Sequence, residues 1–187
     1  LTIHPRMSQY LNISKQIRSI MEKVTPIIQP ISIDEAFLDL SGTEKLHKCI
    51  PVVSMLKIQK EIIQEIGITV SIGLSYNKSM AKLASEQNKP NGFFALGKEE
   101  AEKWLEEKPI SIIFGLGKST VKKLNAVNIY LCKDLRASSI VKIKKILGNN
   151  TEKILNISKG IDDRPVISKS DVKSISVETT FSNKKNI

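Results

Sequence analysis

The sequence lacks long hydrophobic runs, paired cysteines and the spacings of Cys and His that hold metals. No apolar stretch approaches the roughly 20 residues that a membrane-spanning helix needs, and the first residues lack the pattern of a signal peptide. Cys49 and Cys132 stand far apart, with no Cys-x-x-Cys or Cys/His ligand spacing. These absences argue against a membrane protein, a disulfide framework and a zinc site. They predict two reduced, partly buried thiols in a cytoplasmic protein.

What is present is a globular composition. The chain has 187 residues, of which 41% are hydrophobic and 26% are charged, enough for one or two domains with a core. It begins with Leu1 and not with Met, so we expect it to be an internal piece of something longer or a trimmed chain.

The net charge of +10 is unevenly distributed along the chain. Residues 1–114 carry 14 Lys and Arg against 13 Asp and Glu, whereas residues 115–187 carry 15 against 6. One interpretation is a soluble, lysine-rich surface without a specific partner. The other is a polyanion-binding face on the last two-fifths of the chain, with nucleic acid as the expected polyanion.

The first hundred residues alternate between helical and extended patterns. Apolar residues at helical spacing predict helices, and alternating apolar residues predict strands. Helices are expected over 5–22, 52–66 and 77–87, a strand-turn-strand over 27–41, and strands over 68–76 and 93–96. Asn77 is expected to cap its helix, and residues 90–92 form a turn. This order predicts an α+β fold with one mixed sheet.

After Glu99 the pattern becomes helical. A helix over 101–107 is followed by a short helical turn over 109–114, a helix to about residue 126, and short helices to about residue 159. These residues predict a small, basic, all-helical domain. The segment SISVETTF, residues 174–181, alternates like a strand but has no obvious partner strand in this chain.

Two adjacent acids interrupt the strand-turn-strand PISIDEAFLDLSG. Neighbouring side chains on a regular strand point to opposite faces, so Asp34 and Glu35 on one continuous strand would place a carboxylate in the core. The pair makes sense at the tip of a tight hairpin, where both acids face a common guest. We therefore expect Asp34 and Glu35 together at a hairpin tip that faces the cleft between the first part of the chain, up to about residue 98, and the helical domain that follows it.

The hairpin FGLGKSTVKKL allows three interpretations. A P-loop would need glycine at Ile112 and a buried parallel strand before it, and neither is present. A plain helix-turn-helix explains the glycines alone. A phosphate-binding nest explains both the glycines and the basic surroundings, because amides at a helix start hold phosphates without reading bases. Its expected contacts are the solvent-facing amides of Gly115, Leu116 and Gly117, and the side chains of Lys118, Lys122 and Lys123.

A second basic cluster lies in SYNKSMAKLASEQNKPNG. Lys78 and Lys82 are one helical turn apart and share a face, which is consistent with either a solvated helix surface or an anion site. Lys89 precedes the Pro-Asn-Gly turn, which fixes the origin of its side chain near the strand ends.

Five motifs follow one another in an order that resembles the Y-family translesion DNA polymerases. They are SIDEAFLDLSG, IGLSYNKSMAKLASEQNKPNG, IFGLGKSTVKKL, GIDDRP and KSISVETTF. The resemblance covers essentially the whole chain and is closest to the DinB-like, DNA polymerase IV group. It implies a ferredoxin-like palm over 1–98 without its first strand, a helical thumb with a helix-hairpin-helix over 99–162, and over 163–187 a linker with the first strand of a truncated little finger domain.

The same resemblance implies the site chemistry. Asp34 and Glu35 would ligate two Mg²⁺ ions, which prefer carboxylate oxygens. Lys89 would contact the triphosphate of an incoming deoxynucleoside triphosphate, and residues 115–118 would hold the backbone of primer-template DNA. The implied protein is a monomer without a membrane partner, and contact with a sliding clamp would belong to the full-length protein.

The sequence also departs from the family pattern. The family begins with a strand that carries a further metal-binding Asp and an aromatic residue, followed by the fingers, and none of these precedes Leu1. Two interpretations follow. The chain is a piece of an error-prone DNA polymerase that is inactive alone, or it is a degenerate or split product that only binds DNA through its thumb.

Overall fold

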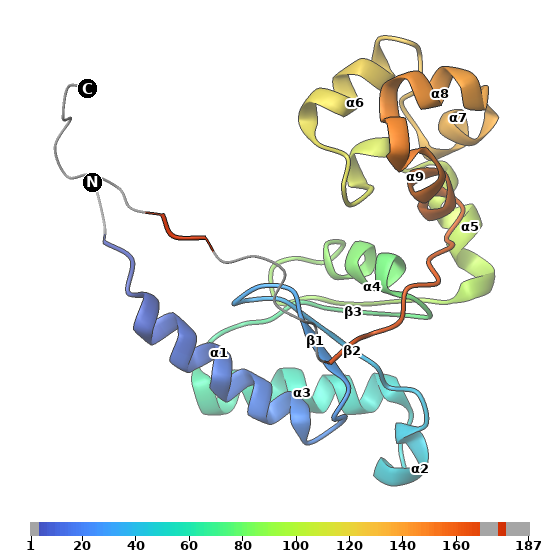
Figure 1. Ribbon diagram of the computed structural model, residues 1–187. Helices are drawn as coiled ribbons and strands as arrows, with labels where there is room; N and C mark the ends of the chain where they lie inside the picture. The colour runs from blue at the N-terminus through green and yellow to red at the C-terminus, as the bar shows by residue number, and fades with distance from the viewer. Residues whose placement is uncertain (1–3, 169–175, 179–187) are drawn as a thin grey trace, which may run out of the picture.

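The computed structural model describes residues 4–168 and 176–178. Figure 1 shows strands and helices α1, α3 and α4 in the lower part of the molecule, with α6 to α9 grouped above them. The lower elements are α1 (Met7–Glu22), β1 (Ile28–Pro30), β2 (Ala36–Leu38), α2 (Thr43–His47), α3 (Pro51–Ile66), β3 (Ile72–Ser75), α4 (Lys78–Ser85) and β4 (Phe93–Leu96). The upper elements are α5 (Lys98–Glu106), η1 (Ile110–Ile112), α6 (Lys118–Asn125), α7 (Cys132–Ala137), α8 (Ile140–Leu147), η2 (Gly148–Asn150) and α9 (Thr151–Ser158).

The strands form two separate pairs, so the expectation of one mixed sheet is wrong. Strands β1 and β2 are antiparallel, whereas β3 and β4 are parallel. A groove of about 950 Å³ lies between the pairs and is lined by residues 31–42, which include β2, and 69–78, which include β3. No residue of β1 or β4 lines it. The edges of β2 and β3 that face the groove therefore have no strand partner within the described residues.

The strand predicted over 68–76 is shorter than expected. Strand β3 covers only Ile72–Ser75, because its partner β4 begins opposite Ile72 at Phe93. Residues before Ile72 extend past this partner, and the carbonyl of Val70 instead accepts a hydrogen bond from Gln59 Nε2 at 2.9 Å. Strand length is therefore set by the neighbouring strand rather than by the apolar pattern.

The predicted helices begin and end where their capping residues stand. Helix α3 starts with Pro51 in its first turn, where proline is tolerated, and ends at Gly67 with φ +78°. Helix α4 is capped by Asn77, whose side chain accepts a hydrogen bond from the Met80 amide at 2.9 Å. These boundaries agree with the prediction to within two residues.

Two hydrophobic clusters support the fold. The smaller joins α1 and α3 through Ile20, Met55, Ile58 and Ile62, with Leu38, Leu40, Ile72 and Phe93 packed against it. The larger runs from Met80 in α4 and Leu96 in β4 through the helices α5 to α9. The larger cluster therefore crosses the predicted domain boundary after residue 98, and that boundary stays a prediction.

The helical pattern predicted after residue 99 is confirmed. Backbone hydrogen bonds join the segment that leads from α5 into η1 to the start of α7, from the Ile110 amide to the Tyr130 carbonyl and from the Cys132 amide to the Lys108 carbonyl, both 2.9 Å. Within the described part of the chain, no helix is long and apolar enough to cross a membrane. The strand predicted over 174–181 lies mostly outside the described residues.

Candidate active-site groove and phosphate-binding hairpin

The two acids lie in the turn of the β1–β2 hairpin. Residues 31–35 connect the strands, and the Ile31 amide donates to the Glu35 carbonyl at 2.9 Å, which closes the turn. Asp34 is exposed and Glu35 is half-buried, and both line the groove between β2 and β3. The structure thus places the pair at a hairpin tip, as the broken alternation predicts. The expected cleft is wrong, however, because the groove that the two acids line lies between β2 and β3, and no residue of helices α5 to α9 lines it.

The carboxylate of Asp34 is held in its ionised form. Ser32 Oγ donates to Asp34 Oδ1 at 2.5 Å, and this hydrogen bond lowers the pKa of Asp34. The positive charges of Lys82 and Lys89 lower it further. Asp34 therefore presents a charged oxygen ligand at the rim of the groove.

A chain of ion pairs connects Glu35 to Lys89. Lys82 pairs with Glu35 and, at 3.1 Å, with Glu86, and Glu86 pairs with Lys89 at 2.8 Å. Burial works to lower the pKa of Lys82, but the hydrogen bonds with the two glutamates outweigh burial and raise it. The Lys89 hydrogen bond is the main cause of the lowered pKa of Glu86. The Lys82 ammonium therefore occupies the Glu35 carboxylate, which is the group that a cation would otherwise bind.

Lys78 differs from Lys82 although both share a helix face. Lys78 is 9% exposed, and its Nζ donates to Gln29 Oε1 at 2.7 Å and to the Pro165 carbonyl at 3.0 Å. Burial is the main cause of its lowered pKa. Its side chain also lies over the ring of Phe37, 5.3 Å from the centroid. Lys78 is thus neither on a solvated helix surface nor in a free anion site.

Two residues of the groove could serve as ligands of a divalent cation. The donor chemistry fits, because Asp34 and Glu35 offer the hard carboxylate oxygens that Mg²⁺ takes. Within the residues that the structure describes, however, no group of three or more His, Cys, Asp or Glu could hold a metal ion. The two acids therefore fit as two ligands of a larger set.

The hairpin before α6 has the expected shape but fewer free amides than expected. Gly115 has φ +102°, a conformation that glycine adopts without strain. The Leu116 amide donates to the Ile113 carbonyl at 3.1 Å, so the prediction that it faces solvent is wrong. The short turn after η1 uses this amide to close itself. Among the described hydrogen bonds, none has the amide of Gly115 or Gly117 as its donor.

Further donors come from the first turn of α6. Lys118 and Ser119 are exposed, and amides in a first helical turn have no partner within the helix. Helix α6 also places Lys122 and Lys123 at the exposed surface. The hairpin and the helix start thus offer several donors and positive charges at the exposed surface, a composition that is compatible with an anion site.

Sequence reasoning did not predict the roles of Glu86, Asp162 and Arg164. The i,i+4 spacing of Lys82 and Glu86 indicated a local pair, but not that Lys82 would also reach Glu35. Asp162 and Arg164 stand in the motif GIDDRP, and their contact with Ser79 spans more than 80 residues of sequence. No local pattern signals such a pair.

Two family models match the chain. A model of the impB/mucB/samB family matches residues 1–86, and one described as the thumb domain of DNA polymerase-iota matches residues 113–162. The DNA polymerase IV of Brucella melitensis is 43% identical over 181 residues, 97% of this chain and 41% of that protein. The DNA polymerase IV of Clostridioides difficile is 36% identical over 186 residues, 99% of this chain and 50% of that protein. The chain spans about half the length of such relatives.

Solved structures agree in fold. A crystal structure of a DinB family error prone DNA polymerase from Sulfolobus solfataricus has a TM-score of 0.84 at 28% identity, over 92% of this chain and 52% of that chain. An insertion ternary complex of Dbh DNA polymerase has a TM-score of 0.79 at 29% identity, over 86% of this chain and 47% of that chain. Because residues 1–86 and 113–162 match these family models, and both the sequence and the fold match DNA polymerase IV and DinB proteins, the chain belongs to the Y-family DNA polymerases, in the DinB-like group of DNA polymerase IV.

Proposed function

We propose that this chain supplies catalytic acids and the DNA-binding thumb for template-directed, error-prone (translesion) DNA synthesis. The observation that carries the proposal is that Asp34, Glu35 and Lys89 line a single groove. Nucleotidyl transfer needs oxygen ligands for metal ions beside a positive charge for the triphosphate, and the groove offers both. The substrates would be primer-template DNA and deoxynucleoside triphosphates, and the protein would act in the cytoplasm.

Each residue has a distinct role in this proposal. Asp34 and Glu35 would hold the divalent ions, for which we propose two Mg²⁺. When bound, the ions supply charge stabilisation across the attacking and leaving oxygens. Lys89 would orient the triphosphate as a point charge. Lys82 pairs with Glu86 as well as with Glu35, so its ammonium would stay paired if Glu35 served as a metal ligand.

The thumb would bind the duplex through its phosphates. The amides of Gly115, Gly117 and Lys118, with the side chains of Lys118 and Lys122, would hold the backbone and read no bases. We propose that the complete enzyme places a further strand in the groove between β2 and β3, since both edges lack a partner among the described residues. That strand would bring the remaining metal ligand.

DNA binding by the chain itself is the first test. Fluorescence anisotropy with a labelled primer-template should show weak binding without sequence preference, and a log-log salt slope of about −2 to −5 if a few phosphates are neutralised. Lys118→Met should make this slope shallower by about 1, whereas Lys60→Met, at the far end of the molecule, should leave it unchanged. A chain that ignores DNA at low salt would refute the thumb assignment.

Glycine substitutions separate amide donation from lysine charge. Gly117 has φ −72° and open space where the Cβ of a larger residue would lie, so Gly117→Val should fold normally and still weaken DNA binding by blocking phosphate approach. Gly115→Val would add backbone strain at φ +102°, so its loss of binding would mix two causes. Equal affinity of Gly117→Val and the parent for DNA would contradict amide binding.

Reconstitution tests the catalytic assignment. The chain joined to the upstream and little-finger segments of a relative should add nucleotides in a Mg²⁺-dependent way. Glu35→Ala in that protein should reduce the rate by several orders of magnitude at nearly unchanged DNA affinity, because metal ligands stabilise the transition state. Glu100→Ala, an exposed acid in α5, is the matched control. Full activity without Glu35 would overturn the assignment.

A second candidate function is DNA binding alone, by a degenerate or split polymerase product. It is favoured by the lack, within the described residues, of a third acid that could complete the metal site. DNA binding together with an inactive reconstituted protein would support this candidate.

A further inference from the structure

The two halves of the proposed site belong to different hydrophobic clusters. The β1–β2 hairpin that carries the two acids (the acid hairpin, residues 28–40) packs through Leu38 and Leu40 against the α1–α3 cluster, whereas α4 and the thumb share the larger cluster. The groove separates β2 from β3, so no backbone pairing joins the acid hairpin to β3 within the described residues. Apolar packing therefore connects the acid hairpin to the thumb only indirectly, through the α1–α3 cluster and the β3–β4 pair, which contacts both clusters.

A segment after α9 crosses from the thumb back to the hairpin. Figure 1 shows this strap, residues 160–167, descending from α9 beside the strands toward β1 and β2. At its start, the Gly160 carbonyl accepts hydrogen bonds from Tyr76 Oη at 2.7 Å and Asn77 Nδ2 at 2.8 Å. The end of the thumb is thereby fixed at the junction of β3 and α4.

Asp162 fixes the middle of the strap to the start of α4. Its side chain is 4% exposed, and Oδ2 accepts from the Ser79 amide at 3.0 Å and the Ser79 hydroxyl at 2.6 Å. Arg164 donates to both carboxylate oxygens at 2.7 Å, and its Nη2 also reaches Ser79 Oγ at 3.3 Å. These bonds are charge-assisted and directional, so they fix orientation as well as distance.

The end of the strap contacts the acid hairpin itself. Gln29 in β1 accepts from Lys78 Nζ at 2.7 Å and from the Ile167 amide at 3.2 Å. Lys78 also donates to the Pro165 carbonyl at 3.0 Å. One buried ammonium therefore joins α4, the strap and the strand that leads into the acid turn.

We infer that the strap is a positioning device, in which Asp162, Lys78 and Gln29 hold the acid hairpin at a fixed distance and orientation from the thumb. Burying a lysine and an aspartate costs desolvation that apolar residues would avoid, and a fixed geometry is one reason to retain such groups. The geometric statement is independent of the proposed function. Its consequence, that DNA held by the thumb meets Asp34 and Glu35 in one register, rests on that function.

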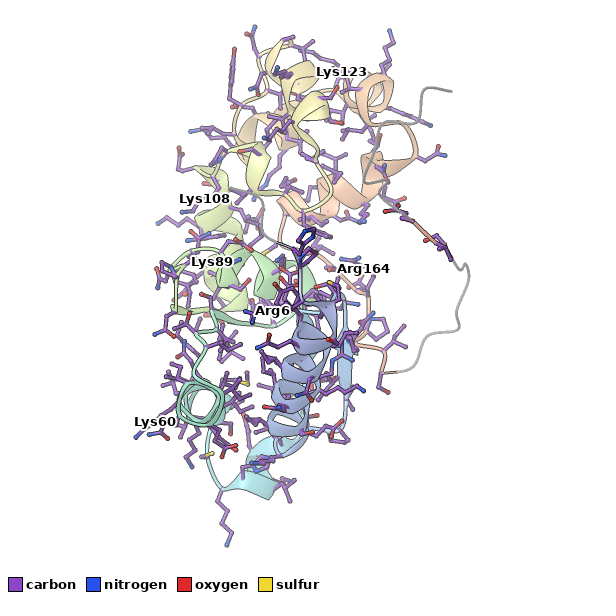
Figure 2. All side chains as sticks on the ribbon, turned by 90° about the vertical axis from the view of Figure 1, so that its left-hand side faces the viewer. Arg6, Lys60, Lys89, Lys108, Lys123 and Arg164 are labelled. Carbon is purple, nitrogen blue, oxygen red and sulfur yellow. The ribbon has the colours of Figure 1, made fainter. Side chains whose placement is uncertain are left out.

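Distances between spin labels on the two halves test the inference. Lys60 in α3 and Lys123 in α6 lie near opposite ends of the molecule, as Figure 2 shows, and both are exposed. Spin labels on Lys60→Cys and Lys123→Cys, in a Cys49→Ser background, report the distance between α3 in the smaller cluster and α6 in the larger one. Cys132 stays in place, because it is fully buried and burial raises its thiol pKa to about 11, so it does not take a label.

Pulsed electron paramagnetic resonance should give one narrow distribution of label-to-label distances for the doubly labelled parent. Asp162→Asn and Lys78→Met should each broaden the distance distribution about twofold or add a second population. Without these contacts, arrangements in which the hairpin and the thumb stand differently lie close in free energy to the native one. Asp163→Asn, an exposed neighbour in the same strap, should leave it unchanged. Far-UV circular dichroism should be the same for all four proteins.

An unchanged narrow distribution in both strap variants, with native circular dichroism, overturns the inference. If Asp162→Asn loses its helical signal, Arg164→Gln is measured instead, because this variant keeps the Asp162 carboxylate and the contacts of that carboxylate with Ser79. The measurement uses neither DNA, metal nor catalysis, so its result is separate from the success or failure of the proposed function.

Discussion

Asp162→Asn should destabilise the chain by about 2–3 kcal/mol at pH 7. The Asp162 side chain is buried, and its carboxylate accepts two hydrogen bonds from Ser79. Hydrogen bonds to a charged group contribute about 1.5–3 kcal/mol. Arg164 is 48% exposed, so its pair with Asp162 adds only about 0.2–1 kcal/mol after solvent screening. Asparagine keeps one acceptor oxygen but turns an amide donor toward the guanidinium.

Thermal unfolding is the direct assay for this loss. In a chain of this size each kcal/mol shifts Tm by about 2–4 °C, so Asp162→Asn should lower Tm by about 5–10 °C. Asp163→Asn removes the same charge from the next residue, which is exposed, and should stay within about 0.5 kcal/mol of the parent. Equal Tm values for the two variants would refute the energetic role of Asp162.

The difference in stability between the parent and Asp162→Asn should be lost at acidic pH. Burial alone would raise the pKa of Asp162, but hydrogen bonds from Arg164 and Ser79 outweigh burial and hold it well below its usual range. A lowered folded-state pKa stabilises the fold above the unfolded-state pKa of about 3.9, and this stabilisation is lost as the pH falls through the folded-state value. The neighbouring cations Lys78 and Arg164 stay charged in that range. The stability difference between the parent and Asp162→Asn should therefore begin to shrink below about pH 4 and vanish only as the pH falls through the folded-state pKa.

Two further predictions concern packing and thiol exposure. Gly73→Ala should lower the free energy of unfolding by about 3 kcal/mol or more, because its Cβ would lie 2.0 Å from the Ala81 carbonyl oxygen. Urea unfolding measures this loss, and a near-native midpoint would contradict the close approach of β3 and α4. Of the two thiols, only Cys49 should react quickly with a thiol reagent under native conditions, because Cys132 is fully buried and its pKa is raised to about 11; two fast equivalents would contradict that burial.

The positions of the acids and of Lys89 could be predicted because local rules determine them. Two adjacent acids cannot both face solvent on a regular strand, so Asp34 and Glu35 required a turn, and the turn is there. The Pro-Asn-Gly turn likewise fixed Lys89 near the strand ends, and it lines the same groove. The catalytic and nucleotide-binding roles of these residues stay predictions that follow from the family.

The contacts that connect the parts could not be predicted, because they join residues far apart in sequence. Lys78 and Lys82 have the same helical neighbourhood, yet one is buried against the strap and the other pairs with Glu35. Their difference depends on where the β1–β2 hairpin and the strap lie in space. The split of the predicted sheet has the same origin, since strand pairing depends on which edges meet.

The hairpin at α6 shows how far a motif alone extends. The glycines predicted a turn with free amides, and φ +102° at Gly115 agrees with that reason for glycine. Which amides are free depends on how the turn closes, and here the Leu116 amide is used by the Ile113 carbonyl. A motif thus predicts the kind of backbone, whereas its hydrogen bonds decide the available donors.

The division of the molecule into two clusters places unusual weight on its polar contacts. A catalytic acid must lie within a fraction of an ångström of its productive position, and apolar packing connects the α1–α3 cluster to the thumb only indirectly, through β3 and β4. Directional, charge-assisted bonds add a direct connection, because each fixes an angle as well as a distance. Buried Asp162 and Lys78 are costly choices for stability alone. Their cost is understandable if what they fix is the register between the groove that Glu35 lines and the hairpin that we propose to bind phosphates.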